Sequence, residues 1–81
     1  MKYPKLTAVT LLENYQLLLT FNEKEQRIYN FKPHLNHKFY RELSNPILFH
    51  HVKIHDGEIE WATGQDFCPH TLFIDSIPVK N

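Results

Sequence analysis

The sequence predicts an α+β fold in which short helices pack on antiparallel strands, within one domain that spans residues 1–81. Three observations predict it. Apolar and polar residues alternate through the first third of the chain, an Asp-Gly pair separates two further alternating runs, and prolines stand where helices are expected to begin. In chain order we expect a three-stranded antiparallel meander, two short helices, a β-hairpin and a C-terminal helix (β-β-β-α-α-β-β-α).

The three strands of the meander are expected at Leu6 to Leu12, Tyr15 to Phe21 and Arg27 to Phe31, joined by turns at Glu13-Asn14 and Glu23-Lys24. If both turns contain two residues, the pairing sorts the side chains into two faces. The expected core face holds Ala8, Thr10, Leu12, Tyr15, Leu17, Leu19, Phe21 and Ile28. The opposite face then holds Val9, Leu11, Gln16, Leu18, Thr20, Arg27 and Tyr29.

Two short helices are expected after Pro33, which ends the third strand because it has no N–H to donate to a sheet. Phe39 and Leu43, four residues apart, predict a first amphipathic helix. Asn45 and Pro46 predict the N-cap and first turn of a second helix, which Ile47, Leu48 and Phe49 would make mostly buried.

The clearest local pattern runs from Val52 to Trp61, with Asp56-Gly57 at its centre. Such a pair favours a type I′ turn, because both central residues need a positive φ. The resulting register pairs Ile54 with Ile59 and Val52 with Trp61 on one face. On the other face it pairs Lys53 with Glu60 and His55 with Glu58, so opposite charges face each other.

A C-terminal helix is expected to open at Pro69 and to stop at Pro78. It would carry Leu72, Phe73 and Ser76, and its cap would lie near Asp66 or Cys68.

Composition narrows the function classes. Nine Lys and Arg residues balance nine Asp and Glu residues, which argues against a broad nucleic-acid or anionic-membrane surface. A single cysteine excludes an internal disulfide, and neither a signal peptide nor a membrane-spanning apolar run is recognisable. We therefore expect a cytoplasmic protein.

Candidate chemical groups are present but do not form a recognisable site. Six histidines raise the possibility of a zinc site, yet no Cys pair completes one, and Lys53 between His51 and His55 opposes a cation. Cys68, two residues from His70, is a candidate nucleophile, but no oxyanion-hole motif accompanies it in the sequence. Carboxylates that could act in pairs are Glu58, Glu60, Asp66 and Asp75, but nothing places two of them in one cleft. No phosphate or dinucleotide motif appears, so we expect no catalytic residue, no metal and no cofactor.

Aromatic residues favour an alternative function in nucleic-acid binding. Exposed rings on a sheet stack on single-stranded bases, and the candidates for this role are Tyr15, Tyr29 and Phe31, with Arg27 and Lys32 nearby. The basic residues are scattered rather than striped, so direct nucleic-acid contact is the second reading.

The opposite face of the meander is the candidate interface, through Val9, Leu11, Leu18 and Tyr29. An apolar group of this size is rarely left exposed by a monomer unless a partner covers it. Either another protein or a second copy of the chain occupies this face, or the C-terminal helix covers it as a second core layer. Both readings stay open at this point.

The chain also resembles a known family. The residues that carry the resemblance are the run Leu12 to Phe21, the run Arg27 to Phe31, and the stretch from Gly57 to Leu72 with its Ile-Glu-Trp and Gly-x-Asp-Phe-x-Pro motifs. It is similar to the bacterial family catalogued as domain of unknown function 2442. The motif residues of unknown role are Glu60, Trp61, Gly64, Asp66, Phe67 and Pro69. The sequence departs from the family pattern at Asn30 and His70, where acidic residues are common.

The resemblance implies a small cytoplasmic α+β protein encoded beside another small protein, as in toxin–antitoxin pairs. It implies no catalytic residues, and the helix-turn-helix of longer members is absent here. We therefore expect a non-catalytic protein–protein interaction module, antitoxin-like or regulatory, whose partner is a small protein encoded nearby or a second copy in a homodimer. The alternative is a single-stranded nucleic-acid-binding module, and the third reading is a small enzyme or metal-binding domain.

Overall fold

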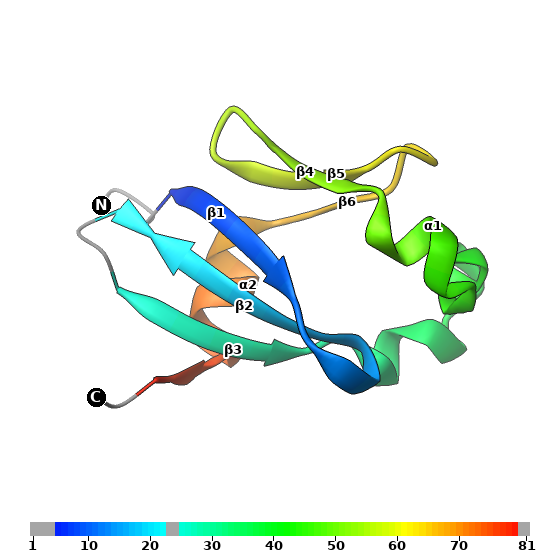
Figure 1. Cartoon of the computed structure of the whole chain (residues 1–81), viewed down its shortest axis with the longest axis horizontal. Helices are drawn as coiled ribbons and strands as arrows, with labels where there is room; N and C mark the ends of the chain where they lie inside the picture. The colour runs from blue at the N-terminus through cyan, green and yellow to red at the C-terminus, as the bar shows by residue number, and fades with distance from the viewer. Residues whose placement is uncertain (1–4, 23–24, 80–81) are drawn as a thin grey trace.

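The computed structural model describes residues 5–22 and 25–79, which form an α+β fold with two antiparallel sheets. The first sheet has the strand order β1-β2-β3-β7, and the second has the order β4-β5-β6. In Figure 1 the two sheets lie one above the other, with α1 at one end and α2 drawn behind the first sheet. The predicted fold class is confirmed.

The first sheet begins as the expected meander, formed by β1 (Leu6–Leu11), β2 (Gln16–Phe21) and β3 (Gln26–Asn30). Its fourth strand, β7 (Ile77–Pro78), pairs antiparallel with β3 and was not predicted. A two-residue strand shows no alternation that sequence reasoning can detect.

Both turns of the meander are one residue longer than the two residues predicted, and this overturns the predicted faces. Leu12 N–H donates to Gln16 O (2.8 Å), with the 3₁₀ turn η1 (Glu13–Tyr15) between them. Phe21 N–H donates to Glu25 O (2.8 Å), so three residues again separate the paired positions. Of these, Glu23-Lys24, the predicted second turn, lie outside the described residues. Side chains alternate along a strand with a period of two. One added residue in a turn therefore reverses which side chains of the next strand share a face with those of the strand before it.

The connection between the sheets is built from two 3₁₀ helices, η3 (Lys32–Asn36) and η4 (Lys38–Ser44), and from α1 (Pro46–His50). The first predicted helix is therefore a 3₁₀ helix, with three residues per turn. That geometry aligns Tyr40 with Leu43 toward the core, whereas Phe39 is 54% exposed.

The helix α1 begins as predicted. The Asn45 side chain accepts a hydrogen bond from Ile47 N (2.9 Å), and Pro46 occupies the first turn. Phe49 is buried, but Ile47 is 68% exposed, so the expectation that this helix is mostly buried was wrong. Five residues do not make enough turns to bury three consecutive side chains.

The hairpin of the second sheet has the predicted register. β4 (Val52–His55) and β5 (Glu58–Trp61) pair Val52 with Trp61 and Ile54 with Ile59. Asp56 has φ +53° and Gly57 has φ +81°, as a type I′ turn requires. A short third strand, β6 (Asp66–Phe67), pairs with β5 and was not predicted.

The C-terminal helix α2 (Pro69–Asp75) opens at the predicted proline, with Cys68 as its N-cap residue. Its end is set by Ser76, which adopts extended backbone and leads directly into β7. Leu72 is fully buried, and Phe73 stacks edge-on against Phe21 with ring centroids 5.2 Å apart. The helix therefore packs on the core side of the first sheet.

The core lies between the two sheets and is rich in aromatic rings. Phe31 is fully buried, with ring centroids 5.0 Å from Trp61, 5.3 Å from Tyr40 and 5.8 Å from Phe49. The Trp61 indole donates to Phe49 O (3.0 Å), which satisfies its one polar group within the core. The remaining fully or nearly buried apolar side chains come from all parts of the chain: Leu6, Leu17, Leu19, Phe21, Tyr29, Leu43, Ile59 and Leu72.

Candidate protein-interaction face

The side of the first sheet that faces away from the core carries a continuous row of side chains across all four strands. The registers place Thr10 beside Leu18, Leu18 beside Ile28, and Ile28 beside Ile77. Leu18 and Ile28 are half-buried by their neighbours, while Ile77 is 71% exposed. Three branched aliphatic side chains therefore form an open apolar strip on this side of the sheet.

We call this side the outer face. Its members share one orientation, which follows from alternation along strands whose odd-numbered residues Leu17, Leu19 and Tyr29 are buried. They are Ala8, Thr10, Gln16, Leu18, Thr20, Gln26, Ile28, Asn30, Ile77 and Val79. None of these side chains is ionisable. The outer face is thus uncharged as well as partly apolar.

The helix α2 does not cover the outer face. Arg27 lies on the core side of β3, where its guanidinium stacks over Phe73 at 4.4 Å from the ring centroid. The same guanidinium donates to Ser76 Oγ (2.7 Å) and to Ser76 O (2.8 Å). These contacts tie the end of α2 to the core side of the sheet, opposite to the apolar strip. The second-core-layer reading therefore does not apply to Leu18, but it does apply to Val9, Leu11 and Tyr29, which lie on the core side of the sheet.

The four residues predicted to share an interface are divided by the structure. Leu18 lies on the outer face, whereas Val9 and Leu11 pack against the core and Tyr29 is only 5% exposed. The reason is the longer turns, which place Val9 opposite Leu19 and Tyr29 opposite Leu17. The neighbours of Leu18 on the outer face are instead Thr10 and Ile28, both of which were predicted to face the core. Ile77 was missed altogether, because the two-residue strand β7 gives no detectable pattern in the sequence.

Both edges of the first sheet are closed to further strands at specific positions. Val79 N–H donates to Gln26 O (3.0 Å), so the neighbouring Pro78 turns its backbone nitrogen away from β3. A proline there offers no N–H to an added strand. At the other edge, Leu6 N–H donates to Gly57 O (3.0 Å) of the hairpin turn. The addition of a strand from another molecule is therefore opposed at these two positions.

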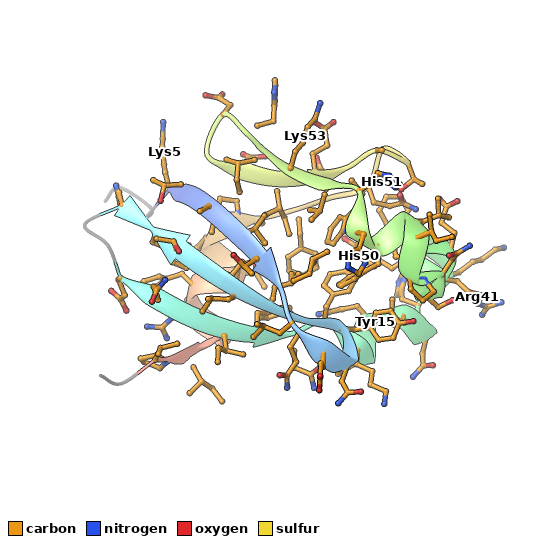
Figure 2. The ribbon with its side chains drawn as sticks, viewed as in Figure 1. Lys5, Tyr15, Arg41, His50, His51 and Lys53 are labelled. Carbon is orange, nitrogen blue, oxygen red and sulfur yellow. The ribbon has the colours of Figure 1, made fainter. Side chains whose placement is uncertain are left out.

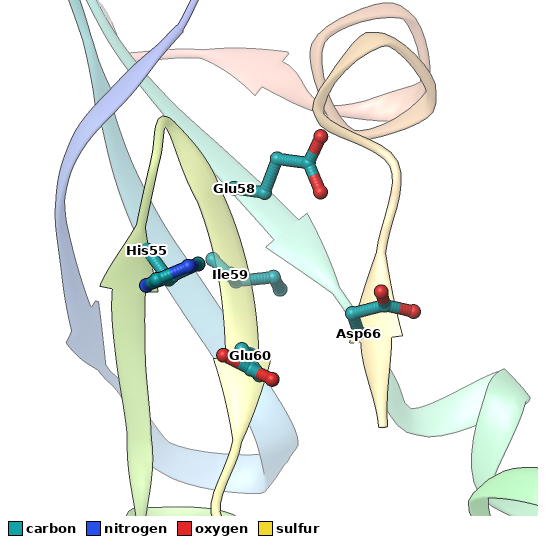
Figure 3. Close-up of a pocket in the computed structure, with 5 residues that line it drawn as sticks. All are labelled: His55, Glu58, Ile59, Glu60 and Asp66. Atoms are coloured by element: carbon teal, nitrogen blue, oxygen red, sulfur yellow. The ribbon is translucent and has the colours of Figure 1, made fainter. Parts of the chain in front are cut away.

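The exposed side of the second sheet has the opposite character. Its outward side chains, on β4, β5 and β6, are all ionisable: Lys53, His55, Glu58, Glu60 and Asp66. Figure 3 shows the last four of these side chains. A small hollow of about 70 Å³ lies among them. Glu60 stands directly opposite Asp66, an arrangement of like charges that costs stability.

The family-motif residues divide into structural and exposed ones. Trp61 and Phe67 belong to the core, Gly64 adopts φ +103° in the turn, and Pro69 opens α2. Glu60 and Asp66 are the members that project to the outside. Sequence reasoning missed one buried residue inside the motif.

That residue is Gln65, which is 5% exposed and fully hydrogen-bonded. Its side-chain amide donates to Phe39 O (3.0 Å) and to Glu42 Oε1 (2.5 Å), and its carbonyl oxygen accepts from the Thr63 hydroxyl. These bonds fasten the turn after β5 to η4. The sequence does not indicate this buried role of Gln65, because a polar residue beside exposed neighbours is expected to be exposed as well.

His34 and His37 both have defined structural partners. His34 Nε2 and the Tyr29 hydroxyl form a 2.6 Å hydrogen bond, and the two rings stack with centroids 5.8 Å apart. Burial, reinforced by the negative charge of Asp75, raises the pKa of Tyr29 to about 12. Burial also lowers the pKa of His34 below its ordinary value. His37 Nδ1 accepts from Phe39 N (3.1 Å) and caps η4.

Three of the candidate carboxylates, Glu58, Glu60 and Asp66, line the small hollow on the second sheet, so the expectation that no two of them share a cleft was wrong. Among residues 5–22 and 25–79, no three His, Cys, Asp or Glu side chains are grouped so as to hold a metal ion. Cys68 is exposed at the start of α2. The residues named for base stacking are also displaced, since Phe31 and Tyr29 are buried in the core and Arg27 is engaged with Glu25 (2.7 Å) and Ser76.

Two surface hollows adjoin His50, which is labelled in Figure 2. One, of about 250 Å³, is lined by the η1 turn with Pro46 and Phe49, and the other, of about 330 Å³, by His51, Val52, Lys53 and Ala62. Tyr15 reaches across from η1, where it has φ +62°, and its hydroxyl donates to Ser44 O. Its ring packs edge-on against Phe49 at 5.1 Å. These contacts fasten the first turn to α1.

Comparison with known proteins adds a family but no characterised relative. A family model described as a protein of unknown function (DUF2442) matches residues 6–77. No curated protein and no solved structure matches the chain. None of the helices within the described ranges is long and apolar enough to cross a membrane.

Proposed function

The chain belongs to the DUF2442 family of proteins of unknown function, and from this premise we propose that it is a non-catalytic protein–protein interaction module that binds its partner through the outer face. The partner is a small protein, encoded nearby or identical to the chain itself. The proposed setting is the cytoplasm of a bacterium.

The observation that carries the proposal is the open apolar strip formed by Leu18, Ile28 and Ile77. Ile77 is 71% exposed, and burying the exposed part of such a side chain contributes about 1–2 kcal/mol. An apolar strip that the chain's own helix leaves uncovered is the surface a partner would bury. Its position on a four-stranded sheet makes it flat and pre-formed, so little ordering is needed before binding.

The absence of ionisable groups on the outer face favours a protein over a nucleic acid as the partner. Single-stranded nucleic acids are held by cationic side chains along the phosphate backbone together with exposed rings. The outer face carries neither. A partner that presents its own uncharged, partly apolar surface fits it better.

The cellular role that we propose is antitoxin-like or regulatory. In such a pair one small protein acts by covering a surface of the other, and this requires an interface rather than a reaction centre. The support for this role is the resemblance of the chain to a family whose members are often encoded in two-gene pairs.

The test is co-expression with the product of the adjacent gene, followed by purification through a tag on this chain. We expect the adjacent protein to co-purify with the wild type. Its recovered amount should fall at least tenfold with Ile77→Lys, because burying a lysine ammonium without a partner is costly. The readout is quantitative mass spectrometry of the eluted proteins, completed by titration calorimetry of the purified pair.

The matched control is Ile47→Lys. Ile47 is also a strongly exposed isoleucine (68%), but it lies on α1, away from the outer face. Recovery of the adjacent protein with Ile47→Lys and its loss with Ile77→Lys would support the proposal. Equal recovery with both variants would contradict the assignment of the interface to the outer face.

A further inference from the structure

We propose that the two hollows beside His50 form one binding site for a small ligand that joins a planar ring to a phosphate group, as a nucleoside monophosphate does. The site is separate from the proposed interface, because none of the residues that line it belongs to the outer face. Three properties carry the inference: the wall that the hollows share, the basic lining of one and the apolar lining of the other.

His50 forms the wall that the two hollows share. Its Nδ1 donates to Pro46 O (2.9 Å), because a carbonyl oxygen can only accept, and this bond orients the ring at the end of α1. The other ring nitrogen, Nε2, has no hydrogen-bond partner among the described residues. In Figure 2 the labelled residues Lys53, His51, His50 and Tyr15 follow one another from the second sheet to the η1 turn. A ligand that extends past His50 can therefore contact both hollows.

The larger hollow, of about 330 Å³, suits a phosphate group. Lys53, His50 and His51 line it, beside Val52 and Ala62, and no carboxylate of the described residues does so. A phosphate monoester carries up to about two negative charges and three acceptor oxygens, so it can accept hydrogen bonds from several basic groups at once. The volume of this hollow lies at the lower end of the range for small-molecule sites.

The charge of Lys53 is available to a ligand. Its cross-strand neighbour is Glu60, but that carboxylate lines the small hollow among the acidic side chains of the second sheet. Lys53 forms no ion pair with any residue that the structure describes. Acidic and basic side chains of this sheet thus line different hollows.

The smaller hollow, of about 250 Å³, suits a planar ring. Tyr15, Phe49, Pro46 and Leu12 line it with rings and an aliphatic side chain, which favour a flat and largely apolar group. Glu13 lies in the same lining, where its carboxylate can accept a hydrogen bond from an amino group on the ring and would repel a phosphate. The ligand is therefore expected to bind in one direction, with its phosphate in the larger hollow.

The test is an NMR titration of the isotope-labelled full chain with adenosine monophosphate, adenosine and inorganic phosphate. Because both hollows are open to solvent, we expect a dissociation constant on the order of 1 mM for adenosine monophosphate and weaker binding of each fragment, so each probe is added up to about 20 mM. Amide signals should shift at both hollows, in particular those of Asn14, Tyr15, His51 and Ala62.

Two variants separate the contributions of the hollows. Lys53→Gln should raise the dissociation constants of adenosine monophosphate and phosphate about fivefold or more and leave that of adenosine unchanged. Leu12→Asn makes the apolar lining more polar without adding a charge. It should weaken the binding of adenosine monophosphate and adenosine about threefold or more and leave that of phosphate unchanged. The matched control is Lys32→Gln, at an exposed lysine that lines neither hollow, and it should bind all three probes like the wild type.

Circular dichroism checks that the variants fold, and the exposed position of Lys53 keeps the test decisive if Leu12→Asn does not. A titration with adenosine monophosphate that shifts no signals at the two hollows would overturn the inference. Equal weakening by Lys53→Gln and Lys32→Gln would also overturn it, because it would indicate unspecific attraction of anions. If adenosine and phosphate each bind as tightly as adenosine monophosphate, the two hollows do not act as one site.

Discussion

At the scale of the single residue, burial and a hydrogen bond to His34 make Tyr29 a structural side chain. It is 5% exposed, and its hydroxyl is bonded to His34 Nε2 at 2.6 Å. Its pKa of about 12 keeps the hydroxyl protonated in any physiological medium. Tyr29 and His34 therefore form a structural pair at the margin of the core, where Phe67 also packs against His34 with ring centroids 5.0 Å apart.

The lowered pKa of His34 predicts that stability depends on pH. Since burial favours the neutral imidazole in the folded state, protonation favours the unfolded state, whose histidine has a pKa near the ordinary 6.5. The contribution is fully present above that value and is lost as the pH falls through it toward the folded pKa. We expect the free energy of unfolding to decrease from about pH 7.5 to about pH 5.5, and to decrease less in His34→Gln, as measured by urea titration at each pH.

Tyr29→Phe is the companion variant for this prediction. It removes the hydrogen bond at a cost of about 1 kcal/mol at every pH. Burial is the main cause of the lowered pKa, so the pH dependence should survive in this variant. An equal loss of stability with acidification in the wild type and in His34→Gln would contradict the assignment.

At the scale of the element, the length of each turn decides what a strand presents to the core. Asn14 and Tyr15 have φ values of +59° and +62°, and together they add a third residue to the first turn. A left-handed tyrosine is strained, and its ring packing against Phe49 and its hydrogen bond to Ser44 hold it in place. Contacts outside the meander thus stabilise the turn that sets the register within it.

The helix α1 depends on its cap, because five residues cannot form a stable helix alone. Asn45→Ala removes the oxygen that accepts from Ile47 N, and it should lower the free energy of unfolding by about 1 kcal/mol. Chemical denaturation followed by tryptophan fluorescence measures this, since Trp61 of β5 donates to the backbone oxygen of Phe49 in α1.

Asn45→Asp is the control, because a carboxylate can accept the same hydrogen bond and also interacts favourably with the helix N-terminus. It should retain the stability of the wild type. If Asn45→Ala is as stable as Asn45→Asp, the cap contributes little and tertiary packing alone holds α1.

At the scale of the whole molecule, the chain separates its charges. The second sheet carries ionisable side chains on its exposed side, the first sheet carries none on its outer face, and the formal net charge is zero. This asymmetry is the physical basis of the proposed function.

The stability of the molecule as a whole depends on its aromatic core, and Phe31 lies at the centre of it. Phe31→Ala should cost about 3–5 kcal/mol, because the cavity removes contacts with several rings at once. A domain of this length has a total stability of about 4–12 kcal/mol, so this variant should lose at least a quarter of it. Phe39→Ala, at a side chain 54% exposed, should change the stability by no more than about 0.5 kcal/mol.

Urea denaturation of the two variants, with near-ultraviolet circular dichroism as a second probe, tests this contrast. Similar losses at both positions would mean that the core is not organised around Phe31.

The sequence by itself determined the features that depend on neighbouring residues. Asp56-Gly57 specified the hairpin register, Asn45-Pro46 the start of α1, and Pro69 the start of α2, because each acts through local backbone geometry. The α+β class and the family resemblance also followed from the chain alone.

Only the tertiary structure decided which side chains face outward on the first sheet. That outcome depends on one added residue in each turn, and contacts with distant elements stabilise at least the first of these turns. The pairing of β7 with β3 likewise depends on Arg27 and Ser76, which are far apart in the sequence. The candidate site could therefore not be predicted, because side-chain alternation is exact along a strand but its phase is set by contacts that no local pattern records.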